Sequence, residues 1–509
     1  MGFIKKYALP LAVVSLIAIY LLTRLYNILG LPIFTDEAIY IRWSQIALQD
    51  ASWRFISLTD GKQPMFVWLA MILLHFINDP LLAGRLVSVL SGLLTAVGLF
   101  LLTREVFKNN KIALLSSLLY ILFPFALVYD RVAMYDSLVA MFIMWSLYFE
   151  ILLVKRLRLD IALILGMIIG LGLLTKTSAD FALILLPFSL LLFAYQNKNL
   201  KKNLLHWFGF ILITSILANI IYSILRLSPF FYIIGQKNYV FIYSPKEWLQ
   251  HPFEFLFNNL NTLSNWFIGY ATIPFLILIL ASFFISRKFT KEKLLLLAWF
   301  IIPLVATALF GRLLYPRFML FMTLPLIALA AYTLFTLMTK AKNLWFKIFI
   351  FLIFTLMLLI KDYYIITDFQ KAPIPQSDRE QFITGWPSGV GVAQSIKILQ
   401  QEAKDKKIFV GTQGTFGLMP YALEIYLDKN PNIKIAGYWT DTKQWPSSRK
   451  PPAQVISMSK KMPTYFIFYQ DCSGCRSIGV APSSWPVKKI YQVEKEKKGQ
   501  FLTLYKIEP

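Results

Sequence analysis

The sequence has few cysteines, histidines and acidic residues. Of its 509 residues, two are Cys, three are His and 27 are Asp or Glu, against 51 Lys or Arg. One Cys pair, Cys472 and Cys475, excludes a disulfide framework, and the lack of a second pair argues against a structural zinc site. A short disulfide, a metal half-site and two free thiols all remain open for this pair. The sequence also lacks an internal repeat of the kind found in inverted-repeat transporters.

Apolar residues dominate the chain. Hydrophobic residues make up 57% of it, which excludes an ordinary soluble globular protein of this length. Many apolar runs approach the roughly 20 residues that cross about 30 Å of hydrocarbon. The net charge of +24 could suggest a nucleic-acid partner, but most Lys and Arg lie in short clusters between apolar runs. That pattern is typical of cytoplasmic loops facing anionic lipid.

The basic clusters predict the topology. They lie near residues 5–6, 104–111, 155–158, 198–202, 287–293 and 340–347. Placing all six in the cytoplasm requires a pair of spans between successive clusters. This predicts about 11 transmembrane helices, with the N-terminus cytoplasmic and the C-terminus extracytoplasmic: 7–28, 81–103, 112–129, 137–154, 160–175, 179–196, 204–225, 269–286, 294–311, 317–338 and 344–361. Five loops then face outwards: 29–80, 129–136, 175–178, 226–268 and 311–317. Within the first of them, the apolar stretch 65–77 predicts an interfacial or re-entrant helix.

The composition changes after Lys361, where a polar C-terminal region begins. We predict a membrane domain over 1–361 and a soluble, extracytoplasmic α/β domain over 362–509. Strands are expected at 407–410, 433–436, 464–469 and 501–507, and a helix at 418–427. The glycines of 411–417 fit neither a P-loop nor the dinucleotide fingerprint and indicate a turn.

Two adjacent acids, Asp36 and Glu37, follow Thr35 in the first predicted outer loop. Unpaired acids beside a membrane are costly unless a site uses them. The same face offers cations and aromatic residues. Carboxylates act as general bases or metal ligands, and Lys and Arg bind phosphate. Together these groups fit a reaction between an extracellular hydroxyl and a lipid-linked phosphate.

Several segments resemble, in order, the GT-C membrane glycosyltransferases, and in particular the protein O-mannosyltransferase-like group that includes the lipid A aminoarabinose transferases. The similarity covers about residues 1–340, and Gln63 stands where the family often has Pro. The C-terminal region does not resemble a well-known catalytic module. The similar segments are Thr35-Asp36-Glu37, Gly61-Lys62-Gln63-Pro64, Gly84-Arg85-Leu86, Arg131 to Asp136, Leu174-Thr175-Lys176 and Tyr315-Pro316-Arg317-Phe318.

The resemblance implies an inverting transfer of a sugar from a polyprenyl-phosphate donor to an acceptor hydroxyl on a protein, lipid or glycan. Asp36 would act as the base or orient the acceptor, and Glu37 would hold the loop or an Arg in place. A phosphate leaving group needs no general acid. Expected contacts of the donor phosphate are Lys62, Arg85, Arg131 and Arg317. The resemblance also implies substrate contacts at Asp136, Lys176 and Tyr315. His251 matches no family segment, and its place on the predicted outer face makes it a candidate contact for substrate, as a ligand of a metal or phosphate.

Structural roles are the alternatives for these residues. Asp36 and Glu37 could mark a helix start with Thr35 as N-cap. Arg85 and Arg317 could be interfacial anchors, and Lys62 an exposed loop charge. Asp136 could cap the fourth span and pair with Arg131.

A transporter or flippase of lipid-linked sugars is the alternative function, although it requires charged groups at mid-membrane that the apolar runs rarely contain. A third reading is a membrane-anchored binding protein. No cofactor is required by the pattern. A divalent cation is possible, because two acids and one His could recruit one, but no full ligand set is visible. Nucleic acid is not an expected partner.

Overall fold

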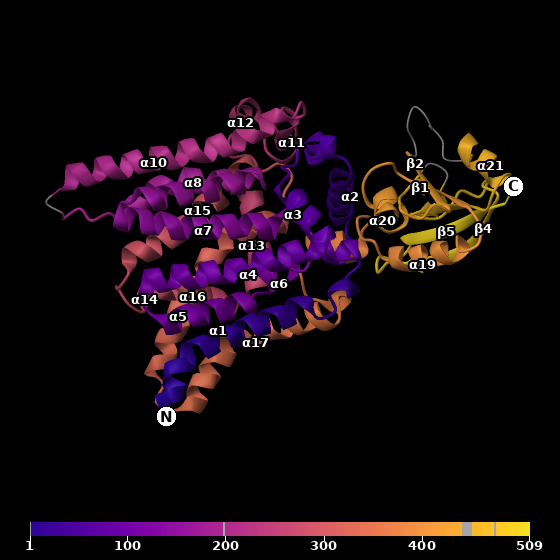
Figure 1. Cartoon of the computed structure of the whole chain (residues 1–509). Coiled ribbons are helices and arrows are strands. Elements are labelled where there is room, and N and C mark those ends of the chain that lie inside the picture. The colour runs from indigo at the N-terminus through magenta and orange to yellow at the C-terminus, as the bar shows by residue number, and fades with distance from the viewer. Residues whose placement is uncertain (1, 197–198, 440–449, 473–474, 509) are drawn as a thin grey trace. The chain divides into compact units, whose positions relative to one another are not determined.

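The computed structural model describes residues 2–196, 199–439, 450–472 and 475–508, so Lys198 of the predicted basic clusters lies outside the described residues. Contacts divide the chain into two compact units (Figure 1). The first comprises Met1–Tyr26, Ser52–Leu69 and Arg85–Pro375. The second comprises Asn27–Ala51, Ala70–Gly84 and Gln376–Pro509. The predicted division at residue 361 remains a prediction about domains, whereas the contacts assign part of the first predicted outer loop to the C-terminal unit.

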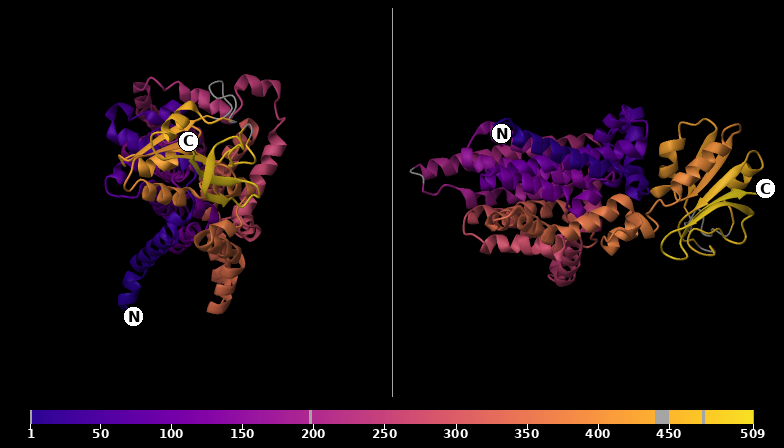
Figure 2. Two further views of the ribbon diagram at one scale, coloured as in Figure 1. Left: turned by 90° about the vertical axis from the view of Figure 1, so that its right-hand side faces the viewer. Right: turned by 90° about the horizontal axis from the view of Figure 1, so that it is seen from below.

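The first unit is helical, and its helices run side by side in the views of Figures 1 and 2. Backbone groups in hydrocarbon must find hydrogen bonds within their own segment, which favours helices for these apolar runs. Two helices, α3 (Met65–Leu74) and α4 (Pro80–Phe107), cross the division between the units. The others are α1 (Gly2–Leu25), α5 (Asn110–Ile121), α6 (Pro124–Tyr129), α7 (Tyr135–Arg156), α8 (Leu159–Leu173), α9 (Asp180–Leu185), α10 (Leu200–Tyr222), α11 (Ile233–Phe241), α12 (Pro245–Gln250), α13 (Leu256–Ala271), α14 (Ile273–Phe284), α15 (Thr290–Phe310), α16 (Leu320–Lys340) and α17 (Leu344–Thr367).

Seven helical segments of the described chain are long and apolar enough to cross a membrane, or eight if a bent pair counts as one span. Seven of the eleven predicted spans fall on these segments. Three more fall on shorter apolar segments, Asn110–Ile121, Leu159–Leu173 and Thr177–Leu192. The chain is therefore a multi-span membrane protein with the predicted order of helices.

The predicted span 269–286 is wrong at its start. Helix α13 ends at Ala271, and α14 begins at Ile273 after a bend of 102°. Thr272, between them, has a φ of 67°, and Pro274 lies in the first turn of α14. Because proline lacks an N–H and restricts the residue before it, it begins a new helix and does not continue α13. Hydropathy alone does not detect this bend.

The loops of the first unit form two groups separated by the length of α7. Asp136 lies in the first turn of α7 and Lys155 in its last turn, about 30 Å away at 1.5 Å per residue. Lys155 Nζ lies 3.1 Å from Glu105 Oε1, and the rings of Phe107 and Phe289 lie 5.4 Å apart. Three of the predicted basic loops therefore meet at one end. At the other end of α7, Asp136 pairs with Lys176, and Asp60 pairs with Lys237. These four residues lie in four of the predicted outer loops.

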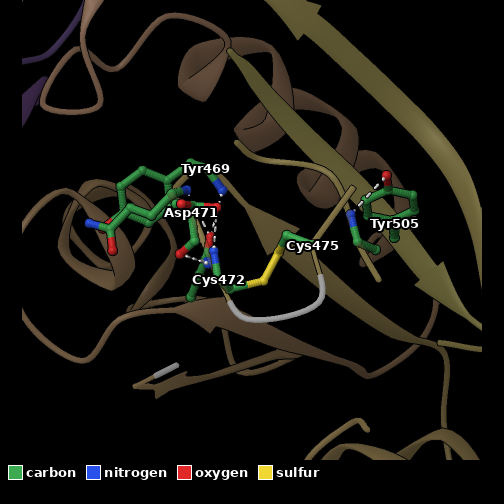
Figure 3. Close-up of a disulfide and its surroundings, with 8 residues drawn as sticks. Tyr469, Asp471, Cys472, Cys475 and Tyr505 are labelled. Carbon is green, nitrogen blue, oxygen red and sulfur yellow. Dashed lines mark hydrogen bonds between the residues drawn. A yellow bond between two sulfur atoms is a disulfide. The ribbon is translucent and has the colours of Figure 1, made fainter. Parts of the chain in front are cut away.

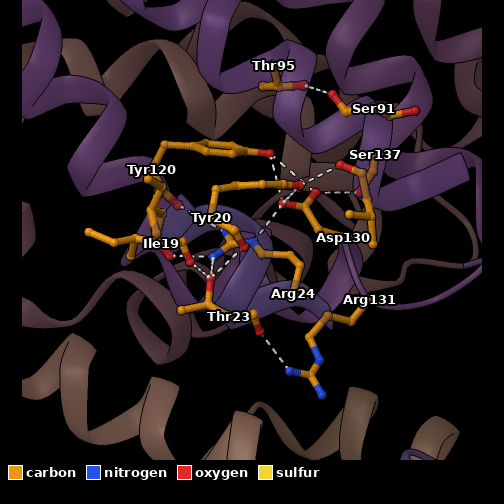
Figure 4. Close-up of polar contacts among 12 residues, drawn as sticks. Ile19, Tyr20, Thr23, Arg24, Ser91, Thr95, Tyr120, Asp130, Arg131 and Ser137 are labelled. Carbon is orange, nitrogen blue, oxygen red and sulfur yellow. Dashed lines mark hydrogen bonds and ion pairs between the residues drawn. The ribbon is translucent and has the colours of Figure 1, made fainter. Parts of the chain in front are cut away.

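A buried ion pair joins several helices of the first unit (Figure 4). Arg24 is fully buried near the end of α1, with Nε 3.4 Å from Asp130 Oδ2. The Asp130 carboxylate also accepts hydrogen bonds from the hydroxyls of Tyr20, Tyr120 and Ser137 at 3.2, 3.1 and 2.9 Å. These donors come from α1, α5 and α7. A charge pair removed from water is tolerated only when its remaining hydrogen-bonding groups are satisfied in this way.

We expect Arg24→Met to destabilise the protein strongly, because it leaves the Asp130 carboxylate buried without its cation. Breaking a buried pair from one side costs about 3–5 kcal/mol. The double variant Arg24→Met/Asp130→Asn should recover part of the loss. Thermal unfolding in detergent, followed by tryptophan fluorescence, measures both. Lys108→Met is the control, since Lys108 is exposed and pairs with Glu105 at the surface, where a pair contributes less than about 1 kcal/mol. Equal melting temperatures for wild type and Arg24→Met would contradict this role.

The second unit is built on a five-stranded sheet of order β2-β1-β3-β5-β4. Strand β1 (Ile408–Gln413) is parallel to β2 (Ile433–Tyr438) and β3 (Thr464–Phe468), and β5 (Phe501–Ile507) is antiparallel to β3 and to β4 (Val487–Glu494). Figure 2 shows these strands in orange and yellow. The helices of the unit include α18 (Gln376–Arg379), α19 (Val392–Glu402), α20 (Leu418–Leu427) and α21 (Ala453–Ser459).

The four predicted strands and the helix 418–427 are confirmed, and the glycine-rich segment forms a turn in which Gly414 and Gly417 have positive φ. Strand β4 was not predicted. It is an edge strand whose side chains are exposed or half-buried, with Lys488 and Lys489 in succession, so it lacks the alternation that marks a strand with one buried face.

Cys472 and Cys475 form a disulfide, which settles the alternatives left open by the sequence (Figure 3). Gln413, at the end of β1, fixes the preceding segment. Its Oε1 accepts hydrogen bonds from the N–H groups of Tyr469 and Gln470 at 2.9 and 2.8 Å. Cys472 itself packs in a hydrophobic cluster with residues of β1, β3 and β5. The disulfide is therefore attached to the core of the sheet.

Helix α2 (Thr35–Gln49), from the first predicted outer loop, belongs to the second unit and packs on α20. Arg42 joins the two helices: its Nε donates to Glu424 Oε2 at 2.8 Å and its Nη1 to Asp428 Oδ2 at 2.9 Å. Gln45 Nε2 donates to the Ile425 carbonyl at 2.8 Å. The segment that carries Asp36 and Glu37 is therefore packed against the C-terminal region of the chain.

Candidate functional site

Asp36 and Glu37 lie in the first turn of α2, and their environments differ. Glu37 is fully buried, and its Oε2 accepts a hydrogen bond from the Phe34 N–H at 2.9 Å. This contact satisfies one of the N–H groups that a helix start leaves without an intrahelical partner. Asp36, by contrast, is half-buried. The prediction that Asp36 and Glu37 have different roles, with Glu37 in support, agrees with this geometry.

The helix-start alternative is correct for Glu37 but wrong about the N-cap. Phe34, not Thr35, is the N-cap residue, and Thr35 is the first residue of α2. The Thr35 hydroxyl donates to the Pro387 carbonyl at 2.9 Å, and its backbone N–H donates to the same oxygen at 3.0 Å. Thr35 therefore faces a distant part of the sequence, since Pro387 lies in the C-terminal region.

Four cations of the first unit gather around two aromatic rings and two carboxylates; we call them the cationic cluster: Lys62, Lys176, Lys237 and Arg317. The rings of Phe241 and Phe318 lie 5.8 Å apart. Lys62 Nζ lies 5.1 Å from the centroid of the Phe241 ring, and Lys176 Nζ lies 4.7 Å from that of Phe318. The faces of aromatic rings attract such cations and hold them close together.

The two carboxylates of this region, Asp136 and Asp60, pair with cations of the cluster. Lys176 Nζ lies 2.6 Å from Asp136 Oδ1, and Lys237 Nζ lies 2.6 Å from Asp60 Oδ1. Asp136 therefore pairs with Lys176 across two of the predicted outer loops. The four cations place positive charge among several loops, which favours an anionic ligand.

Gln63, the departure from the family pattern, connects three loops of the cluster. Its Nε2 donates to Thr177 Oγ1 at 2.9 Å, and that hydroxyl donates to Asn238 Oδ1 at 3.3 Å. Gly61 allows this close approach. It has a φ of 66°, and a Cβ atom there would lie 2.5 Å from Lys237 Cβ. The segment Gly61-Lys62-Gln63 therefore packs closely against helix α11.

Tyr315 and Arg317 lie together at the start of the 3-10 helix η7 (Pro316–Met319). The Arg317 guanidinium carbon lies 4.7 Å from the Tyr315 ring centroid and 5.9 Å from that of Phe318. This stacking places Arg317 at the aromatic pair of the cationic cluster. The structure therefore brings Lys62, Lys176 and Arg317 together.

Arg85 and Arg131 form a second basic group with Arg24. Both are buried, and Arg131 Nη1 donates to the Thr23 carbonyl at 2.8 Å (Figure 4). Burial, followed by the nearby charges of Arg85 and Arg24, lowers the pKa of Arg131 to about 10. Burial of Arg85 argues against a purely interfacial, snorkelling role for this side chain. A direct contact of either arginine with a phosphate stays a prediction.

His251 is exposed at the end of α12, and its Nδ1 lies 3.1 Å from Glu254 Oε2. Across the described residues, no group of three or more His, Cys, Asp and Glu side chains comes together to hold a metal ion. The predicted roles of His251 and of a divalent cation stay predictions.

The sequence did not indicate Lys237, Asn238 and Phe241 as site residues. They lie on α11, in the long fourth loop, which resembles no motif of the family. The available signal was a run of three polar residues, Gln236, Lys237 and Asn238, within a mainly apolar and aromatic segment. Lys237 differs from an ordinary exposed lysine because it pairs with Asp60 beside the Gly61-Lys62 segment.

The chain is similar to known proteins in sequence and in fold. Residues 61–222 match a family described as dolichyl-phosphate-mannose-protein mannosyltransferase. A relative in Wigglesworthia glossinidia brevipalpis, an undecaprenyl phosphate-alpha-4-amino-4-deoxy-L-arabinose arabinosyl transferase, is 27% identical over 216 residues. That match covers 40% of this chain and only 37% of the relative.

Solved structures show the fold. ArnT from Cupriavidus metallidurans, bound to undecaprenyl phosphate, has a TM-score of 0.56 at 14% identity, with 97% of each chain covered. The oligosaccharyltransferase AglB from Archaeoglobus fulgidus, in complex with an inhibitory peptide and a dolichol-phosphate, has a TM-score of 0.52 at 15% identity. There the match covers 83% of this chain and 64% of AglB. The predicted GT-C architecture, a polytopic helical membrane region with a C-terminal soluble domain, is confirmed as the fold.

Proposed function

We propose that this chain is an inverting glycosyltransferase that moves a sugar from a polyprenyl-phosphate donor to an extracytoplasmic hydroxyl of a protein, lipid or glycan. The relatives and neighbours that support this include an arabinosyl transferase named for undecaprenyl phosphate and structures bound to undecaprenyl phosphate and dolichol-phosphate. None of these three is a transporter, so the flippase alternative gains no support from them.

The cationic cluster is the observation that carries the proposal. The donor phosphate is a diester with one negative charge, and departure of the sugar leaves a monoester with a charge between about −1.5 and −2 at pH 7. Lys62, Lys176, Lys237 and Arg317 bring positive charge to one place, where it can stabilise the charge that grows on the departing phosphate. Groups that stabilise charge as it develops lower the barrier and do not merely tighten binding.

Asp36 is the proposed base. The acceptor oxygen attacks the anomeric carbon, the bond between that carbon and the phosphate oxygen breaks with its electron pair staying on the phosphate, and the acceptor proton goes to Asp36. A single displacement inverts the anomeric centre. Glu37 cannot share this role easily, because its carboxylate is buried and bonded to the Phe34 N–H. We propose further donor contacts at Arg85 and Arg131 and further substrate contacts at Asp136, Tyr315 and His251.

We expect Asp36→Asn to lower kcat by about 10²–10⁴-fold, because a general base contributes an effect of this size. The assay offers purified protein a panel of polyprenyl-phosphate sugars and measures release of polyprenyl phosphate, with and without EDTA to test for a divalent cation. Asp405→Asn, a change at an exposed residue of the same unit, is the control and should retain wild-type turnover. Wild-type turnover in Asp36→Asn would remove Asp36 from the mechanism.

Lys62→Met should reduce kcat/KM for the donor by about 10–100-fold, as expected for losing a charge-assisted hydrogen bond of about 1.5–3 kcal/mol. Lys246→Met is the matched control. It removes one positive charge from an exposed residue of the fourth predicted outer loop. Equal effects of the two changes would show that overall positive charge matters, and would refute a specific contact of Lys62 with the phosphate.

We also propose that the cationic cluster and the C-terminal unit are extracytoplasmic and the N-terminus cytoplasmic. Two observations support this orientation. The predicted basic loops meet at the far end of α7 from the cluster, and the second unit carries a disulfide, which persists in oxidising compartments.

Cysteine labelling tests the orientation, since the two native cysteines are joined in a disulfide and do not react. A membrane-impermeant maleimide should label Lys246→Cys in intact cells but Lys340→Cys only after permeabilisation. Both positions are exposed. The reverse pattern would invert the proposed topology.

A further inference from the structure

Lys495 is a buried lysine of the second unit, at the end of strand β4. It is only 3% exposed. Its Nζ donates to the carbonyl oxygens of Ser388, Gly385 and Trp386 at 2.7, 2.9 and 3.3 Å. An ammonium has three N–H donors, so the three acceptors match it fully. Burial lowers the pKa of Lys495 to about 7, whereas hydrogen bonds to carbonyl oxygens favour the charged form of the side chain.

The segment held by Lys495, residues 385–389, pairs with the chain just before α2. Phe34 and Ser388 form an antiparallel bridge, and the Gly389 N–H donates to the Ile33 carbonyl at 2.8 Å. The Pro387 carbonyl accepts both hydrogen bonds of Thr35. We call residues 385–389 the clasp segment.

The clasp segment is shaped for this pairing. A Cβ atom at Gly389 would lie 2.4 Å from the Ile33 carbonyl oxygen, so only glycine fits there. Ser388 is fully buried, and its hydroxyl donates to the Phe382 carbonyl at 2.9 Å. The Phe382 ring in turn lies 5.1 Å from that of Phe34. Backbone bonds, a side-chain bond and ring packing thus all act on the residues that precede Asp36.

We propose that Lys495 is a positioning residue for the transfer reaction, which acts through the clasp segment to fix the first turn of α2 and with it the Asp36 carboxylate. The inference rests on the proposed function for the role of Asp36. It assigns a task to the C-terminal unit: holding the predicted base in place from the far end of the sequence. A base must lie within hydrogen-bond reach of the acceptor proton, and a shift of about 1 Å can cost about 10²-fold in rate.

The first test is kinetic. Lys495→Met should lower kcat by about 10–100-fold and leave the donor KM unchanged, because no donor contact is lost. Lys495→Arg, which keeps charge and donors, should recover much of the rate. Lys495→Met should cause no further loss in an Asp36→Asn background, since the positioned group is already gone. Lys497→Met, a change at an exposed lysine two residues along, should behave as wild type.

The second test does not depend on activity. Hydrogen exchange should show that Lys495→Met loses protection at the N–H groups of Thr35 and Gly389, while strands β1 and β3 stay protected as in wild type. Equal loss of protection across β1 and β3 would mean that Lys495 only supports the domain, and would overturn the positioning role. So would an unchanged kcat, or a further fall in the Asp36→Asn background.

Failure of the proposed function is distinguishable from failure of this inference. A wild-type protein that releases no polyprenyl phosphate from any donor overturns the proposed function and with it the positioning role, whatever the exchange pattern shows. A wild-type protein that turns over, with a Lys495→Met variant that is equally fast, overturns the inference alone.

Discussion

Charge held in a low-dielectric environment is the constraint on which the first unit depends. The pair of Arg24 and Asp130 is fully buried, and hydroxyls from three helices complete the hydrogen bonding of the carboxylate. Such a pair gives little net stability compared with apolar packing, but it strongly penalises any arrangement that separates its partners. It therefore selects one packing of α1, α5 and α7. This packing also fixes the position of Arg131, next to Asp130 in the sequence, and of Asp136, in the first turn of α7.

The same constraint explains why cations collect in the cationic cluster. Aromatic rings attract a cation but carry no net charge, so they hold a lysine in place without neutralising it. A cluster built only from ion pairs would be neutral and offer nothing to an anion. Phe241 and Phe318 hold Lys62 and Lys176 at the meeting point of several loops, and the pair of Lys237 and Asp60 fixes the loop that carries Lys62. The pattern suits a ligand whose negative charge grows during reaction.

Sequence reasoning predicted what depends on composition and local pattern. Spans follow from apolar length, loop grouping from basic clusters, and the strands β1, β2, β3 and β5 from alternation between turn signals. It missed what depends on tertiary contacts. Edge strand β4 has no fully buried face, and the bend at Thr272 lies inside a continuous apolar run. Within the site, Lys62, Lys176 and Arg317 were predicted from a family resemblance. Lys237 and Asn238 could not be predicted in this way, because their place in the site depends on tertiary contacts with Asp60 and Thr177.

Because α2 belongs to the second unit, the C-terminal region contributes to the position of the segment that carries Asp36. A soluble domain that merely follows a membrane enzyme could be removed without harm to the chemistry. Here the residues that precede Asp36 pair with the clasp segment, and Arg42 binds Glu424 and Asp428 further along α2. Deleting 362–509 would remove the hydrogen-bond partners of Thr35 and Arg42 and the helix α20 on which α2 packs. Loss of activity after such a deletion could not be assigned to lost substrate binding, because the position of the predicted base depends on the same residues.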